Sequence, residues 1–475
     1  MKRIRIPALL KMRPLFLIFL FFIQFTEAFS QQNFYDTDQL PPSFHQQRRE
    51  KVRAMLTGNS CAVLFSNPVR NRSNDVDYQY FQDPDFFYLT GLNEPNSMLV
   101  IYSEPVLFEG VSTNEIIYVQ NRDLKKEVWN GRRLGVDGVK SKLGFSTVIE
   151  NTTLQQHLPV VSEKMKVLVK YPFDINESKS GSGNLNTMVV TMKQHFRDYS
   201  IDPSQVGLSR IMSSLREIKS NEELELMQKA IDMTVDGLNE AIKACRPGMT
   251  EYQAQAIVEY FFKKNGSEYP GYGSISGSGI NSCVLHYVTN RKTLENGDML
   301  LMDMGAEYHG YTADVTRTIP VNGKFSQEQK LIYELVLKAQ QEGIAKAIQG
   351  NPFYGPHKAA QAIIAQGLID LGIIKETSEA SIYFNHGTSH YLGMEVHDPG
   401  NYGPLQPGMV ITVEPGIYIP ENSKCDRKWW NIGVRIEDDI LITDNQPFVM
   451  SGKLPSSVVE IEKLMEKESL FNEIK

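Results

Sequence analysis

Cysteine is scarce in this chain, which has four cysteines among 475 residues. They stand far apart, at positions 61, 245, 283 and 425, so their spacing fits neither a small disulfide-stapled scaffold nor a zinc knuckle. Positive charge is not in excess either, because 49 lysines and arginines against 56 aspartates and glutamates give a net charge of −7. Nucleic-acid binding calls for a basic surface, so we expect no nucleic-acid partner.

Long apolar runs are missing after residue 30, so we expect no membrane span in the mature chain. Within residues 1–30, five basic residues precede an apolar run at 14–23, and the small residues Ala28 and Ser30 follow it. This order is typical of a secretory leader. The run has about half of the ~20 residues that cross a bilayer, although a single anchor helix is the alternative. We therefore expect a leader at 1–30 and an exported protein, either periplasmic or secreted.

The chain is long enough for two or three domains of about 150 residues each. Its hydrophobic fraction of 41% and charged fraction of 22% are those of ordinary globular proteins, which excludes a disordered chain. Residues 31–200 combine β-rich runs at 61–65, 98–102 and 115–119 with shorter helical patches. They are expected to form a mixed α/β domain.

Residues 201–475 alternate helix and strand signals. Capping boxes at Ser220–Glu223 and Ser326–Gln329 open two amphipathic helices, and two more helices are predicted at 250–264 and 356–371. Between and after these helices lie β-rich runs at 298–304, 311–319, 409–414 and 433–442. The overall fold class is therefore α+β, with the smaller mixed domain first.

Two aspartates interrupt the first two of these β-rich runs. Asp303 lies within 299–305, and Asp314 lies within 311–317. A hairpin centred between Tyr308 and His309 would set the two carboxylates directly opposite, on one face. Because two like charges about 5 Å apart repel each other, a cation between them would remove the conflict. Two surface aspartates on an edge strand are the alternative.

Histidine is concentrated in one segment of the chain. His386, His390 and His397 fall within twelve residues, whereas the chain has nine histidines in all. Neutral imidazole is a common metal ligand and a proton shuttle near neutral pH. The segment is not the zinc helix H-E-x-x-H, because no glutamate follows these histidines directly. The density predicts a functional site, with ordinary polar histidines in a glycine-punctuated loop as the alternative.

Two glutamates end the later β-rich runs. Glu414 closes the apolar run 409–413, and Glu437 follows 434–436 and shares a face with Arg435 by strand alternation. Either glutamate alone could be a surface residue at a strand end. Together with the two aspartates and a histidine, they make an oxygen-rich donor set. Such a set suits Mn²⁺, Co²⁺, Fe²⁺ or Zn²⁺ in a two-metal arrangement.

The order and local settings of these residues resemble a known family. The segments HGTSHYLGMEVHD (386–398), TVEPGIY (412–418) and GVRIEDD (433–439), after the two aspartates, are similar to the pita-bread metallopeptidases. NDVDY at 74–78 and QDPDFFYLTG at 82–91 resemble the accessory domain of aminopeptidase P. The resemblance implies an aminopeptidase P N-terminal domain at 31–200 and a pita-bread catalytic domain at 201–475. It further implies a proline-specific aminopeptidase, which releases the first residue of peptides whose second residue is proline.

The resemblance also implies a metal centre with two divalent ions, with manganese preferred. Asp303 would hold one ion, Asp314 and Glu437 would bridge both, and His390 and Glu414 would complete the second. A hydroxide shared by the two ions would be the nucleophile, because bound cations lower the pKa of water. Glu414 would accept its proton.

Four further residues receive roles from the same resemblance. His286 and His397 would position the substrate and stabilise the tetrahedral intermediate, His386 would lie near the proline pocket, and Arg435 would orient the carboxylates. The glycine-rich stretch 271–279 does not fit the phosphate-binding pattern, and we interpret it as a loop beside the site that precedes a strand carrying His286. The expected partners are peptides with penultimate proline, and the expected state is a homo-oligomer, a dimer or tetramer.

Three alternatives stay open on the sequence. A prolidase, which cleaves Xaa-Pro dipeptides, is the same-class alternative, although prolidases commonly carry a longer insertion than residues 417–433 allow. A non-catalytic binding protein of the same fold should have lost metal ligands, and creatinase-like hydrolysis is more distant. The segment Trp429-Trp430-Asn431 departs from the family pattern, which leaves the preferred peptide length in doubt.

Overall fold

The computed structural model describes residues 38–162, 165–173, 175 and 181–471. The chain divides into two compact units, Met1–Gln39 and Leu40–Lys475. The leader expected at 1–30 lies outside the described residues. The domain boundary expected near residue 200 falls inside the second unit, so it stays a prediction.

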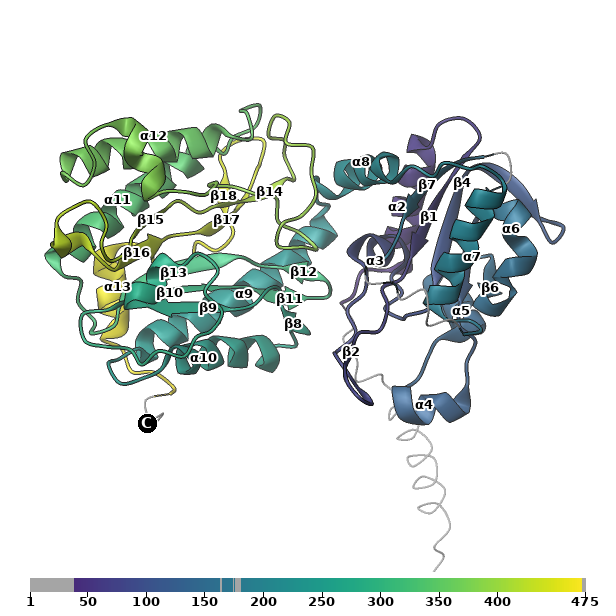
Figure 1. The fold of residues 1–475 in the computed structure, drawn as a ribbon, viewed down its shortest axis with the longest axis horizontal. Coiled ribbons are helices and arrows are strands. Elements are labelled where there is room, and N and C mark those ends of the chain that lie inside the picture. Colours follow the sequence, from purple (N-terminus) through teal and green to yellow (C-terminus); the bar gives the residue numbers. More distant parts are fainter. Residues whose placement is uncertain (1–37, 163–164, 174, 176–180, 472–475) are drawn as a thin grey trace, which may run out of the picture. The chain divides into compact units, whose positions relative to one another are not determined.

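The N-terminal part of the second unit is built on a five-stranded sheet (Figure 1). The strand order is β6-β5-β4-β1-β7, with β1 antiparallel to β4 and parallel to β7. The runs predicted at 61–65, 98–102 and 115–119 are confirmed as parts of β1, β4 and β5. The strands are β1 (Ser60–Phe65), β4 (Met98–Phe108), β5 (Val111–Val119), β6 (Val148–Glu150) and β7 (Lys166–Lys170), with a separate hairpin of β2 (Asn71–Ser73) and β3 (Val76–Asp77).

Both faces of this sheet are covered, which explains the continuous apolar run of β1. The odd-numbered residues of β1 pack with α6 and α7, whereas Ala62 and Leu64 share a core with α2 and α3. The helices of this part are α2 (Pro42–Met55), α3 (Pro84–Thr90), α4 (Leu124–Asn130), α5 (Gly135–Leu143), α6 (Leu154–Ser162) and α7 (Leu185–Asp198), with the 3-10 turn η1 (Asn151–Thr153).

The C-terminal part contains the four predicted helices, which are all confirmed. Ser326 opens α11 with the reciprocal bonds of a capping box, as predicted, and at the predicted start of α9 the Ser220 N–H donates to Glu223 Oε2 at 2.9 Å. Helix α9 packs against α10 and β11–β13, while α11 packs against α12 and β14–β16. The helices are α8 (Gln205–Arg216), α9 (Asn221–Ala244), α10 (Glu251–Lys264), α11 (Gln327–Ile344), α12 (Gly355–Asp370) and α13 (Val458–Met465), with 3-10 turns η2 (Gly279–Cys283), η3 (Thr377–Ile382) and η4 (Arg427–Trp429).

Short antiparallel sheets lie between these two helix pairs (Figure 1). Their strand orders are β13-β10-β9, β12-β11-β8, β14-β17-β18 and β15-β16. The strands are β8 (Tyr269–Pro270), β9 (Ile275–Ser278), β10 (Met299–Met304), β11 (Ala306–Tyr308), β12 (Tyr311–Thr312), β13 (Val315–Pro320), β14 (Val410–Val413), β15 (Gly416–Ile419), β16 (Ile432–Arg435), β17 (Asp438–Leu441) and β18 (Phe448–Val449).

The hairpin that carries Asp303 and Asp314 has a different register from the expected one. Asp303 pairs with Thr316, so the prediction that the two aspartates are direct partners is wrong. The turn residues are His309 and Gly310, with φ of 50° and 82°. Positive φ at both positions belongs to the type I′ turn, whose twist suits a two-residue hairpin. This turn is centred one residue later than expected, which shifts every pair.

Two of the predicted strands are broken at an acidic residue. The run 311–319 becomes β12 and β13 with Asp314 between them, and the run 433–442 becomes β16 and β17 with Glu437 between them. At the breaks, the Asp314 N–H donates to the Asp439 carboxylate at 3.2 Å, and the Glu437 N–H donates to the Thr316 carbonyl at 3.2 Å. These bonds satisfy the backbone outside the strand ladders, so both carboxylates can turn toward a common pocket.

Glu307 on β11 gives the fold a dependence on pH. Burial, together with the charge of Glu268, raises the pKa of Glu307 to about 8. The folded chain keeps this proton up to about pH 8, whereas the unfolded chain releases it near pH 4.3, so stability falls as the pH rises through this window. We expect Glu307→Gln to raise the free energy of unfolding by roughly 2–4 kcal/mol at pH 8 and by less than about 1 kcal/mol at pH 5. Urea unfolding at both pH values measures this, and an equal effect at both would contradict it.

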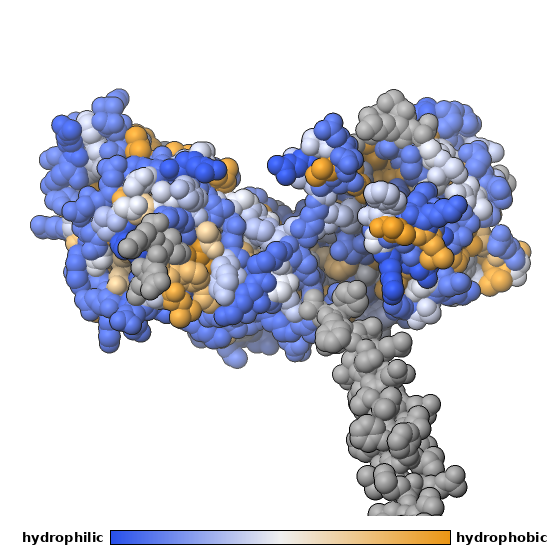
Figure 2. Space-filling view, turned by 90° about the horizontal axis from the view of Figure 1, so that it is seen from below, coloured by the Kyte–Doolittle hydropathy of each residue, from blue (hydrophilic) through white to orange (hydrophobic). Residues whose placement is uncertain are grey.

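The surface is mostly hydrophilic, with separate apolar areas (Figure 2). Helix α4 has three strongly exposed apolar side chains, Leu124, Val128 and Trp129, which are 70%, 82% and 87% exposed. In the part of the chain that the structure describes, no helix combines the length and the apolar character needed to cross a membrane.

Candidate active site

A pocket of about 490 Å³ opens in the C-terminal part of the fold. Its wall is made by residues from β10, from the two broken strands, from the loop 386–398 and from the end of β14. It contains all nine residues that the sequence singles out: His286, Asp303, Asp314, His386, His390, His397, Glu414, Arg435 and Glu437. The fold therefore gathers them in one place, while the role of each stays a prediction.

Asp314, His390 and Glu437 form the tightest group of potential metal ligands in this pocket. One ligand atom of each lies within 4.8 Å of the others. Glu414 adjoins the group, because its Oε1 is 3.4 Å from His390 Nε2. Asp303 joins from β10, since the Tyr272 hydroxyl contacts its Oδ1 at 2.5 Å and Asp314 Oδ1 at 2.6 Å. Four carboxylates and one imidazole thus converge.

The imidazole of His390 has a defined orientation. Its Nδ1 lies 3.0 Å from the carbonyl oxygen of Tyr391. A carbonyl can only accept, so Nδ1 carries the proton and the neutral ring presents Nε2 as a lone pair. That Nε2 faces Asp314 Oδ2 at 3.4 Å and Glu414 Oε1 at 3.4 Å. This is the arrangement of a metal-ligating histidine.

The pocket carries a surplus of buried negative charge. Burial raises the pKa of Glu414 to about 7, and burial with the charges of Asp314 and Glu414 raises the pKa of Glu437 well above its ordinary value. Although burial opposes it, the hydrogen bond with Asp314 and the charge of Glu414 raise the pKa of His390 to about 9. Each shift favours the more positive form of its group. The donor set therefore fits divalent cations, which would relieve the same repulsion.

Arg435 holds the carboxylate side of the pocket. Its Nη2 donates to Asp303 Oδ2 at 2.5 Å, its Nη1 donates to the Tyr418 hydroxyl at 2.9 Å, and its Nε donates to Thr316 Oγ1 at 3.2 Å. Thr316 in turn donates to Glu437 Oε2 at 2.6 Å. The fixed fork of the guanidinium thus connects two of the carboxylates.

These contacts involve three residues that the sequence analysis did not single out: Tyr272, Thr316 and Tyr418. Tyr272 lies in the glycine-rich stretch that was expected beside the site, and Tyr418 ends the TVEPGIY motif. The sequence therefore placed both tyrosines within segments expected at or beside the site. Nothing in the spacing, however, showed that one tyrosine hydroxyl would touch two aspartates, or that another would touch Arg435.

Three histidines surround the acidic group. His386 Nε2 lies 2.9 Å from the Tyr418 hydroxyl, and the ring of His397 stands 4.5 Å from that of His390, edge to face. Burial, with the charge of Arg435, lowers the pKa of His386 to about 4, so this ring is neutral near pH 7. His286 lies in a turn after η2, and the expectation that it sits on a strand is wrong. The 3-10 turn at Gly279–Cys283 ends the β9 strand before His286.

Comparisons with known proteins cover nearly the whole chain. Residues 225–444 match metallopeptidase family M24, and residues 45–169 match the aminopeptidase P N-terminal domain. The chain is 37% identical over 445 residues to a Xaa-Pro aminopeptidase of Haemophilus influenzae, over 90% of this chain and 98% of that one. It superposes on Pseudomonas aeruginosa aminopeptidase PepP with a TM-score of 0.82 and 34% identity, over 90% of this chain and 98% of the other. Zinc-substituted Escherichia coli aminopeptidase P in complex with product gives a TM-score of 0.82 and 33% identity, over 90% and 100%.

Proposed function

The chain belongs to metallopeptidase family M24, and we propose that it is a dimetal Xaa-Pro aminopeptidase. Such an enzyme releases the first residue of a peptide whose second residue is proline. The expected fold, a pita-bread domain with an aminopeptidase P N-terminal domain, is confirmed by both family matches and by the solved relatives. The observation that carries the function is the pocket in which the Asp314, His390 and Glu437 ligand atoms lie within 4.8 Å of one another.

We propose that the metal centre is held by the five residues with oxygen or imidazole donors: Asp303, Asp314, His390, Glu414 and Glu437. When bound, two divalent ions polarise the scissile carbonyl and lower the pKa of water so that it can attack near neutral pH. Carboxylate-rich donors with one imidazole suit manganese, which we propose as the native metal.

The protein's own groups handle the proton and orient the peptide. Glu414 stands at the end of β14 with its Oε1 3.5 Å from Thr412 Oγ1, and we assign it the proton of the attacking water. His286 and His397 line the same pocket, and their ring N–H groups would orient the carbonyl and stabilise the tetrahedral intermediate. Because Arg435 holds Asp303 through a hydrogen bond, the carboxylates would keep their positions while the proton is transferred.

The pocket also has an apolar wall that suits proline. Leu285, Val288 and Val396 line it beside the histidines. A bond before proline has a tertiary amide without an N–H, and its ring fixes φ near −65°, so a general peptidase site receives it poorly. An apolar wall next to the metal centre would accept the ring without leaving a buried donor or acceptor unpaired.

Substrate choice tests this function. We expect release of the first residue from an Xaa-Pro-Yaa-Zaa peptide, with kcat/KM at least about 100-fold higher than for the matched peptide with alanine second, because the pocket wall fits the proline ring. Mass spectrometry of timed digests identifies the released residue. Cleavage of the Xaa-Pro dipeptide alone would contradict the proposal and indicate a prolidase. Equal rates for proline and alanine would contradict proline specificity.

The alternatives have lost support. Two relatives that match nearly the whole chain are Xaa-Pro aminopeptidases, which disfavours a prolidase. All five predicted ligand residues are present and line one pocket, which disfavours a non-catalytic binding protein of the same fold.

We propose two further properties that the sequence motivates. The three-part pattern at 1–30 supports export, and the exposed apolar side chains of α4 support a homo-oligomer that covers them. N-terminal sequencing of the protein outside the cytoplasm tests the first, and retention of full-length chain in the cytoplasm would contradict it. Light scattering tests the second, and a monomer at micromolar concentration would contradict it.

A further inference from the structure

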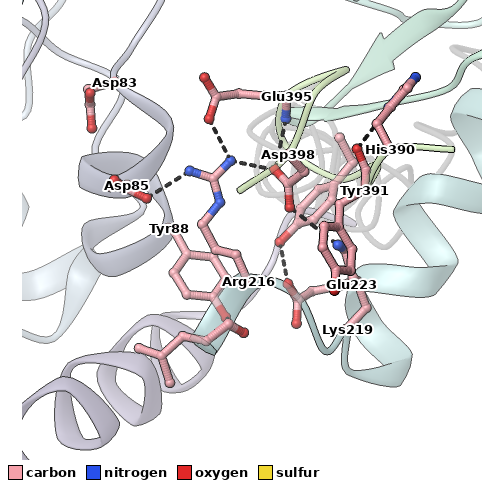
Figure 3. A network of polar contacts seen from close by, with 12 residues as sticks. Asp83, Asp85, Tyr88, Arg216, Lys219, Glu223, His390, Tyr391, Glu395 and Asp398 are labelled. Carbon is pink, nitrogen blue, oxygen red and sulfur yellow. Dashed lines mark hydrogen bonds and ion pairs between the residues drawn. The ribbon is translucent and has the colours of Figure 1, made fainter. Parts of the chain in front are cut away.

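A buried ionic network joins the pocket loop that carries His397 to Arg216 and, through it, to Asp85 (Figure 3). Asp398, the next residue, is 2% exposed. Arg216 Nη2 donates to its Oδ1 at 2.5 Å, and Lys219 Nζ donates to its Oδ2 at 3.2 Å. The backbone N–H of Glu395 also donates to Oδ1, at 3.2 Å. Both oxygens of Asp398 are thus held by cations, one at the end of α8 and one between α8 and α9.

The same arginine reaches the N-terminal part of the unit. Arg216 Nη1 donates to Asp85 Oδ1 at 2.7 Å, and Asp85 lies in the first turn of α3. Lys170 of β7 donates to the other oxygen of Asp85 at 2.6 Å. Arg216 is itself 2% exposed. One planar guanidinium therefore joins α3 to the loop that lines the pocket, with separate nitrogens bound to Asp85 and Asp398.

The loop 390–398 packs against this ionic network. It lies outside the helices and strands, apart from the bridge between Tyr391 and Ile411. The Asp398 N–H donates to the Tyr391 carbonyl at 2.9 Å, which closes the loop. Gly393 packs so closely on the network that a Cβ there would lie 2.4 Å from Asp398 Oδ2. Since Asp398 is adjacent to His397 in the chain, its position sets where that imidazole enters the pocket.

Helix α3 touches a second segment of the site. A Cβ at Gly310, in the turn of the hairpin that carries Asp303 and Asp314, would lie 3.2 Å from the Phe87 ring. Phe87 and Asp85 belong to the same short helix, α3. Both the metal-ligand hairpin and the His397 loop therefore rest on one element of the N-terminal part.

We propose that Arg216 and Asp398 are positioning residues for His397, and that α3 contributes to the catalytic geometry through Asp85. This inference rests on the proposed function in one respect, namely that His397 acts on the substrate. In this proposal the N-terminal part affects the rate of the reaction, because α3 helps to hold the loop that carries His397.

Kinetics of a double-mutant cycle test the inference. We expect Arg216→Met to lower kcat about 10- to 100-fold with KM changed less than about threefold and with bound metal unchanged, because a displaced imidazole loses its contact in the transition state. In a His397→Ala background, the same change should lower kcat less than about twofold, since the arginine acts through that histidine. Independent, multiplying losses in the double variant would overturn the proposal.

A matched control separates positioning from general stability. Arg49 is also fully buried and binds Glu115 with two donors at 2.9 and 3.0 Å, and its Nη1 donates to the Leu89 carbonyl of α3 at 2.8 Å. It contacts α3 without the Asp85 link, so it separates that link from support of the helix in general. Arg49→Met should destabilise the fold while keeping kcat within about twofold per folded molecule. If Arg216→Met does not fold, Asp85→Asn removes the charge that pairs Arg216 with α3 and keeps the shape of the side chain, while the Arg216–Asp398 contact stays in place. A normal kcat in folded Asp85→Asn would overturn the role of α3.

Amide hydrogen exchange tests the same point without catalysis. In metal-free protein, residues 391–398 should exchange at least about tenfold faster in Arg216→Met or Asp85→Asn than in the wild type or in Arg49→Met. Unchanged exchange would overturn the proposal. If the wild type hydrolyses no peptide, the proposed function fails, but the exchange rates still decide whether the network positions the loop.

Discussion

Glu437→Gln is expected to lower kcat/KM for an Xaa-Pro peptide at least about 1000-fold, which corresponds to about 4 kcal/mol of transition-state stabilisation. The substitution keeps the shape of the side chain but replaces a charged oxygen by an NH₂ group, which cannot bind a cation. Glu437 is 2% exposed and stands within 4.8 Å of Asp314 and His390 through its ligand atom. Steady-state kinetics and metal analysis of the same samples measure the loss of activity and of bound metal.

The stability of the metal-free variant shows whether the loss of activity comes from the missing metal ligand or from a destabilised fold. Burial and the charges of Asp314 and Glu414 raise the pKa of Glu437 well above its ordinary value, so an ionised Glu437 destabilises the metal-free wild type. Metal-free Glu437→Gln should therefore unfold at the same temperature as the metal-free wild type or at a higher one. Glu307→Gln, another buried carboxylate outside the pocket wall, should keep kcat/KM within about threefold. A Glu437→Gln enzyme with more than a tenth of wild-type activity would contradict the metal-ligand role.

Removal of the metal ions should abolish hydrolysis altogether. Without cations, protons take their place in the pocket, since the pKa values of His390, Glu414 and Glu437 are all raised. A protonated His390 has no lone pair to offer a cation, and the carbonyl loses the two ions that would polarise it. Metal binding should also stabilise the fold by about 2.7 kcal/mol at a free concentration 100 times the Kd. The metal-free protein should therefore melt at a lower temperature than the loaded one.

Local signals in the sequence predicted much of the fold. The capping boxes at Ser220 and Ser326 placed the starts of α9 and α11, because a cap is made by residues three positions apart. The buried runs of β1, β4 and β5 were visible as continuous apolar residues. The nine pocket residues could be named as well, because each stands in a recognisable motif.

Register and breaks in strands could not be predicted from the sequence in the same way. The hairpin register depends on whether the turn is made by His309-Gly310 or by the pair before it, and a histidine with positive φ is uncommon. The break at Asp314 depends on a bond to Asp439, 125 residues later. Such a partner is set by the tertiary fold, so periodicity predicts a continuous strand where the structure has two.

Long-range polar contacts were also beyond the sequence analysis. Arg216 lies at the end of α8, where a basic residue is ordinary, and it touches Asp398, 182 residues away. Tyr272 likewise meets Asp303 and Asp314 across more than thirty residues. Nothing local distinguishes these side chains from surface residues, because their function comes from what the fold places opposite them.

Stepwise return of Mn²⁺ to the stripped protein tests the central claim most directly. Hydrolysis of an Xaa-Pro-Yaa peptide and the number of bound ions are measured in the same samples after chelation and dialysis. The two-metal pocket predicts no hydrolysis in the stripped protein, recovery as ions bind, and full activity at two ions per chain. Full hydrolysis by the stripped protein, or saturation with metal without any release of the first residue, would contradict a dimetal Xaa-Pro aminopeptidase.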